Sequence, residues 1–180
     1  MRTEFGFERT ECACEECTQN CRFIPGYLIP DDLERLSGVL SFVDADDSFK
    51  LKEWATDFFK LKEWATEHLL ASPGAIVIHN GEVKRVPTLV PARKEDGSCH
   101  WLTEDGRCSV HANAPFGCAF FDAHQTEDEY TPRSVAGIQS VIQSHQRCEN
   151  YSMIWILLMG LGLKAPGPED CREAMENRGS

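Results

Sequence analysis

Four cysteines, Cys12, Cys14, Cys17 and Cys21, lie among three glutamates within the stretch "ECACEECTQNC". Thiols this close together in sequence can form disulfides, bind a metal as thiolates or act as a redox pair. Which of these chemistries applies depends on the redox compartment and on the other cysteines of the chain.

The composition disfavours disulfides. With 180 residues, of which 42% are hydrophobic, the chain can close a core without covalent staples. Nine cysteines are an odd number, which would leave one thiol unpaired. The first ten residues, MRTEFGFERT, lack the apolar segment of a signal peptide. We therefore expect a cytoplasmic protein whose thiols stay reduced.

The cysteine spacing is typical of metal ligands. The motif Cys14-x2-Cys17-x3-Cys21 can bring its sulfurs to one ion or cluster, and a wider set follows, Cys99-x8-Cys108-x9-Cys118. Neither set fills a four-ligand site, so the two combine with each other or with Cys12 and Cys148. The sequence predicts one or two metal sites drawn from eight cysteines, namely Cys12, Cys14, Cys17, Cys21, Cys99, Cys108, Cys118 and Cys148.

The ninth cysteine, Cys171, is left out of this set. It lies in "PEDCREAMENR", where four carboxylates surround it on an expected polar helix. Neighbouring negative charge raises the pKa of a thiol and disfavours the thiolate, so we expect Cys171 not to bind metal.

Two stretches, "CEECTQNCRFIPGYLIPDDLERL" and "CHWLTEDGRCSVHANAPFGCAFF", resemble a cysteine-cluster family of zinc- or iron-chelating domains. Members of that family carry CxxCxxCC, then a helix of the form lTpeDierl, and then a segment of the form CpfL…dgrCsIYe.RPxxCrxfp. The resemblance covers roughly residues 14–40 and 98–122, and both the order and the offsets of the cysteines agree.

The resemblance implies that six cysteines are metal ligands, namely Cys14, Cys17, Cys21, Cys99, Cys108 and Cys118. Asn20 stands where the family has the first cysteine of its CC pair, and Cys12 is a candidate substitute. Ala114 and Ala119 replace arginines of the family pattern, and His111 replaces a tyrosine.

Four cysteines serve either an iron–sulfur cluster or a zinc ion. The loop cysteines lack the paired CxxC knuckles of most structural zinc sites, and aromatic residues beside the ligands would shield a cluster from solvent. These aromatic residues are Phe23, Trp101, Phe116, Phe120 and Phe121. We favour a [4Fe–4S] protein in electron transfer, redox sensing or an accessory role. The alternative is a structural zinc module whose helices bind another protein.

Three histidines, His100, His111 and His124, flank the loop cysteines and could replace a thiolate. With eight cysteines available, we expect them to support the ligands or to face solvent. A Cys118–His124 nucleophile pair is disfavoured because a metal-bound thiol is not free to attack. The chain carries no phosphate loop, dinucleotide fingerprint, nucleophile elbow or HExxH motif, so the sequence identifies no enzymatic activity.

The net charge of −11 disfavours binding to a phosphate backbone. The longest apolar run, Met153 to Leu163, is shorter than the ~20 residues of a membrane span. We therefore expect a protein partner rather than a nucleic acid or a membrane.

Helical signals precede a hairpin signal in the first half of the chain. Asp31 is expected to cap a helix, and the tandem "FKLKEWATDF" and "FKLKEWATEH" predicts a second helix, ended by Ser72-Pro73-Gly74. Asn80-Gly81 predicts a hairpin turn, and "TLVPAR" a third extended piece.

The second half reads as a loop followed by helices. Turn residues between Cys99 and Cys118 predict little regular structure. Thr131 and Pro132 predict the start of a helix to about Arg147, and further helices are expected over 150–162 and 168–177. The fold class is α+β, a mostly helical single domain over 1–177 with a small antiparallel hairpin and loops organised by metal. Residues 178–180 resemble a purification-tag remnant.

Overall fold

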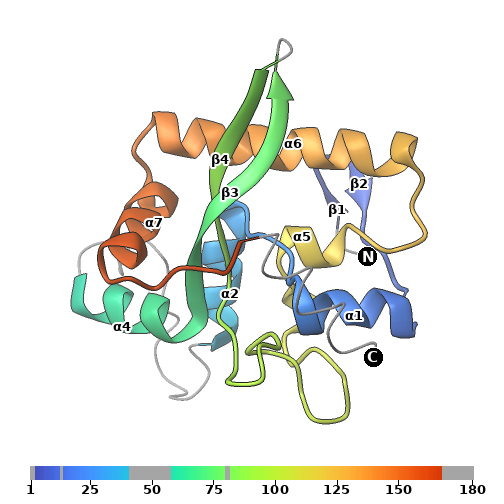
Figure 1. The fold of residues 1–180 in the computed structure, drawn as a ribbon, viewed down its shortest axis with the longest axis horizontal. Helices are drawn as coiled ribbons and strands as arrows, with labels where there is room; N and C mark the ends of the chain where they lie inside the picture. Colours follow the sequence, from blue (N-terminus) through green and yellow to red (C-terminus); the bar gives the residue numbers. More distant parts are fainter. Residues whose placement is uncertain (1–2, 13, 41–57, 80–81, 168–180) are drawn as a thin grey trace.

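The computed structural model describes residues 3–12, 14–40, 58–79 and 82–167, and these form helices and two antiparallel strand pairs, an α+β arrangement as predicted. In chain order the described elements are β1 (Thr3–Glu4), β2 (Phe7–Glu8), α1 (Glu15–Phe23), α2 (Pro30–Leu40), α4 (Phe58–His68), β3 (Leu69–His79), β4 (Glu82–Pro91), η2 (His111–Asn113), α5 (Phe116–Ala119), α6 (Glu127–Gln146) and α7 (Asn150–Gly160). Figure 1 shows the β3–β4 hairpin through the middle of the molecule, with α4 and α7 on one side and α1 and α5 on the other.

The predicted hairpin is confirmed, since β3 and β4 pair antiparallel from Leu69 opposite Pro91 to His79 opposite Glu82. The expected turn residues 80–81 lie outside the described residues. The prediction for "TLVPAR" is wrong, because β4 continues through it to Pro91 and forms no third piece.

The position predicted for the end of the repeat helix is also wrong. Helix α4 ends at His68, and Ser72-Pro73-Gly74 lies inside β3, where the strand register shifts. Gly74 has a φ of 118°, and a Cβ there would lie 2.1 Å from the Val86 oxygen. The β-bulge therefore allows a glycine and a proline to lie within the strand.

Helix α2 is confirmed, but its N-terminal contact comes from Asp32 and not from Asp31. Pro30 occupies the first helical position, and the Asp32 carboxylate reaches back to accept the Ile29 N–H at 2.9 Å. The same oxygen accepts the N–H of Phe116 at 2.7 Å. One buried carboxylate thus joins the start of α2 to the start of α5.

Helix α6 begins earlier than predicted. Thr126 and Glu129 form a capping box at its N-terminus, and Pro132, expected at the first position, lies inside the helix. The capping box supplies partners for the first backbone N–H groups, which explains the earlier start. Helix α7 begins at Asn150, as expected.

The core lies where α2, α6 and α7 pack around the hairpin. The Tyr151 hydroxyl accepts the Leu89 N–H and donates to the Leu28 oxygen, both at 2.8 Å, so α7 is joined to two backbone segments. None of the helices in the described part of the chain combines the length and apolar character that crossing a bilayer requires.

Some expected features lie outside the described residues. These are the first copy of the tandem repeat, the helix expected over 168–177, and Cys171. The sequence analysis also missed the small β1–β2 pair, whose turn places Phe5 and Gly6 at positive φ.

Replacing Asp32 by Ala should destabilise the protein by about 3–5 kcal/mol, because it removes an acceptor for two backbone N–H groups and leaves Arg35 without this buried partner. Urea denaturation measures the change in the free energy of unfolding. The control is Asp31→Ala at the exposed neighbouring position, which should cost about 0.5 kcal/mol or less. Similar losses in the two variants would contradict the role given to Asp32.

Candidate metal centre

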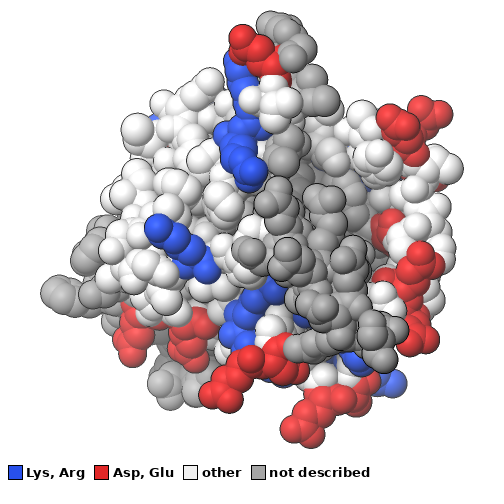
Figure 2. Space-filling view, in the orientation of Figure 1, with Lys and Arg blue, Asp and Glu red and all other residues white. Residues whose placement is uncertain are grey.

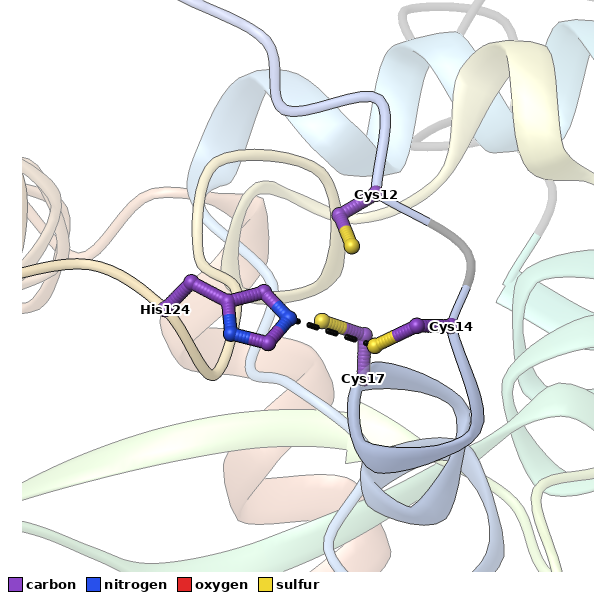
Figure 3. A group of neighbouring side chains, drawn as sticks. All are labelled: Cys12, Cys14, Cys17 and His124. Carbon is purple, nitrogen blue, oxygen red and sulfur yellow. Dashed lines mark hydrogen bonds between the residues drawn. The ribbon is translucent and has the colours of Figure 1, made fainter.

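Three cysteines and one histidine converge at the surface beside the start of α1. The sulfurs of Cys12, Cys14 and Cys17 and a ring nitrogen of His124 all lie within 4.8 Å of one another. The Nε2 atom of His124 is 3.2 Å from the Cys14 sulfur. Figure 3 shows the imidazole facing the three sulfurs from the opposite segment. We name these four residues the exposed group.

Three separate segments position the exposed group. Cys12 lies two residues after Thr10, whose backbone N–H donates to the Ala119 oxygen at 2.9 Å. Cys14 is the N-cap residue of α1, and Cys17 lies in its first turn. His124 belongs to the connection between α5 and α6, where its backbone N–H donates to the Asp122 carboxylate at 2.9 Å.

The electrostatics distinguish the two α1 thiols. The backbone N–H of Cys17 and the imidazole of His124 lower the pKa of Cys14 to about 6. Desolvation raises the pKa of Cys17 to about 11, although the Ala123 N–H, 3.4 Å from its sulfur, acts in the opposite direction. The Cys14 sulfur raises the pKa of His124, with smaller effects from Glu16 and Asp122. Cys14 and His124 therefore favour opposite charges.

Four of the five remaining predicted ligands lie in a second region, in or against the hydrophobic core. Cys21, Cys99, Cys108 and Cys118 lie near enough together that, in each of the six pairs, the charge of one thiolate raises the pKa of the other thiol. Cys99 is buried, and the other three are half-buried against the hydrophobic core. We name these four residues the buried quartet.

Backbone contacts position the buried quartet. Cys99 donates its N–H to the Cys21 oxygen at 2.9 Å, which joins the loop to the end of α1. Cys108 forms an isolated bridge with Leu102. Cys118 belongs to α5, and its sulfur lies 3.8 Å from the Gly26 oxygen. The loop, expected to have little regular structure, contains only the short η2 and α5 within its described residues.

The buried quartet needs a cation if its thiols are to ionise together. Desolvation is the largest cause that raises the pKa of each of the four thiols, and neighbouring thiolates add to it for Cys99, Cys108 and Cys118. Arg9 acts in the opposite direction, and only on Cys108 among the four. A metal held by four thiolates would compensate the negative charge and drive deprotonation.

The structure brings seven of the eight predicted cysteines into these groups. Cys148, the eighth, lies exposed between α6 and α7 with a φ of 51°, in neither group. His100 packs against His68, and His111 lies on η2 at the surface. The family motif is thus divided, with Cys14 and Cys17 in one group and Cys21 in the other.

His124 is the candidate ligand that the sequence analysis undervalued. It lies two residues beyond the stretch that resembles the cysteine-cluster family, and no spacing rule connects it to residues 110 positions away. The one signal for His124 in the sequence was that it lies near a loop cysteine. His100 and His111 also lie near loop cysteines, so this signal did not single out His124.

Comparison of the chain with protein-family models, with curated proteins and with solved structures gives no significant match. Membership of the cysteine-cluster family therefore remains a prediction from the resemblance. A group of cysteines and histidine able to hold a metal ion is present in the structure.

In metal-free, reduced protein, Cys14 should react with iodoacetamide along a pH curve with its midpoint near pH 6, because its pKa is lowered to about 6. Cys17, with a pKa of about 11, should react about 30- to 100-fold more slowly than Cys14 at pH 7, because its thiolate fraction is far smaller although its thiolate is more nucleophilic. Replacing His124 by Ala should move the Cys14 midpoint upward. Mass spectrometry of the labelled peptides measures both rates, and an unmoved midpoint would exclude the imidazole as a cause.

Proposed function

We propose that this protein is an iron–sulfur protein of the cytoplasm in which the buried quartet binds a [4Fe–4S] cluster. The proposal is supported by the packing of Cys21, Cys99, Cys108 and Cys118 against one hydrophobic core, close enough for their charges to interact. Four thiolates are the ligand set of such a cluster, with one thiolate on each iron. Each residue lies in a stretch that resembles the cysteine-cluster family.

The surroundings of the quartet favour a cluster over a zinc ion. Trp101, Phe116 and Phe120 are between 0 and 3% exposed and belong to the same core cluster as Cys99. Apolar walls exclude water, which protects a cluster and tunes its reduction potential. All four residues of the quartet offer a thiol, and none offers an imidazole.

The role that fits this arrangement is electron transfer or redox sensing, in an accessory capacity to a partner protein. Cys21 and Cys108 are half-buried, so a cluster between them would lie near the surface. A short distance to the surface allows electrons to pass to a docked partner. With four protein ligands the cluster would have no open position for substrate.

A second candidate function is a structural zinc module that binds another protein. Helix α7 favours it, because Met153 and Ile156 are 53% and 62% exposed and offer an apolar surface to a partner. In that case all the thiolate sites would hold zinc.

Anaerobically purified protein should be brown and contain about four irons and four sulfides per chain. Cys108→Ser should lose most of the iron and the colour, because the quartet would then be one thiolate short. Cys148→Ser, at an exposed cysteine in neither group, is the matched control and should keep both.

A colourless protein whose metal is zinc alone would contradict the iron–sulfur proposal and support the structural module. Circular dichroism of Cys108→Ser checks that the variant folds, and Cys118→Ala provides a second test at another residue of the quartet. Full iron content in both variants would exclude the quartet as the ligand set.

A further inference from the structure

We propose that Cys12, Cys14, Cys17 and His124 form a second, independent metal site that binds a single zinc ion. The site goes beyond the iron–sulfur proposal, because it uses different ligands and a different metal. Cys12 and His124 lie outside the two stretches that resemble the cysteine-cluster family, so half of this ligand set has no counterpart in that pattern.

The geometry of the exposed group is close to that of one tetrahedral ion. Zinc bonds of about 2.3 Å to sulfur and about 2.0 Å to nitrogen place tetrahedral ligand atoms about 3.6–3.8 Å apart. The four ligand atoms already lie within 4.8 Å of one another, and Nε2 of His124 is 3.2 Å from the Cys14 sulfur. Shifts of about 1 Å or less would therefore complete the coordination sphere.

The ligands are held by interactions outside the coordination sphere. The Ala123 N–H points at the Cys17 sulfur at 3.4 Å, and the backbone N–H of His124 donates to the Asp122 carboxylate at 2.9 Å, in the segment that carries the imidazole. An N–H group that donates to a coordinating sulfur helps to orient that ligand in zinc sites. They leave Nε2 of His124 directed at the sulfurs (Figure 3).

The local charge also suits a divalent cation. Glu15 and Glu16 lie in the first turn of α1, and α6 begins with three acidic residues. Figure 2 shows acidic side chains along the edge of the molecule that carries α1 and the start of α6. Three thiolates at the N-terminus of α1 gain further from the helix dipole.

The two sites share α1 but not their ligands. Cys17 lies in the first turn of the helix with the exposed group, whereas Cys21, one turn later, belongs to the quartet. The exposed group includes an imidazole and lies at the surface, and the quartet contains thiols against the core. These contrasts assign zinc to the first and iron–sulfur to the second.

Zinc binding would hold three segments of the chain together. The ion would join the segment after β2 and the start of α1 to the connection between α5 and α6, where His124 lies 110 residues after Cys14. With four protein ligands the site is closed to substrate, as in structural zinc sites. Its binding energy would contribute to folding, because the unfolded chain has no such site.

Metal analysis of the full chain, purified anaerobically from medium containing iron and zinc, tests the proposal. We expect one zinc per chain in addition to the iron. Cys12→Ser and His124→Ala should each lose the zinc and keep the iron, whereas Cys108→Ser should show the reverse. His124→Cys should restore zinc, since a fourth thiolate replaces the imidazole, and His111→Ala is the matched histidine control that should change neither metal.

Full zinc in both Cys12→Ser and His124→Ala would overturn the proposal, as would the absence of zinc from the parent protein. Loss of iron together with zinc in His124→Ala would show one shared site in place of two. The iron–sulfur proposal fails separately, if the parent protein holds zinc at the exposed group but no iron.

Discussion

Desolvation of four thiols is the main constraint on this structure, because burial against the hydrophobic core raises the pKa of Cys21, Cys99, Cys108 and Cys118. Burial is the largest cause, and neighbouring thiolates add to it for Cys99, Cys108 and Cys118. In the described residues Arg9 is the one side chain found to favour a thiolate of the quartet, and it acts on Cys108. A bound metal would compensate the charge of ionised thiolates, and its binding energy would help the loop to fold.

Close backbone packing also fixes the position of α5 beside the chain that follows α1. A Cβ on Gly26 would lie 2.0 Å from the Gly117 carbonyl carbon, so the chain after α1 crosses the start of α5 in direct backbone contact. Asp32 holds the same start of α5 through the Phe116 N–H. Cys118 therefore keeps its place relative to Cys21 through two independent contacts, one steric and one polar.

The sequence predicted several elements because their signals are local. Cysteine spacing, the apolar period of α2 and the Asn80-Gly81 signal each act over a few residues, and the corresponding helix and hairpin are present. The helix ends were less predictable, since the capping box at Thr126 outweighed the proline signal at Pro132. The division of the motif could not be predicted, because it depends on His124 and the loop cysteines folding against opposite ends of α1.

Amide hydrogen exchange most directly tests whether metal organises the quartet loop. The full chain would be compared with its metal bound and after removal of the metal by a chelator under reducing, anaerobic conditions. We expect the amides of Cys99, Leu102 and Ser109, which donate to backbone oxygens in the loop region, to lose protection without metal. The Leu89 amide, which donates to the buried Tyr151 hydroxyl, should keep its protection. Equal protection of the loop amides with and without metal would contradict the central claim.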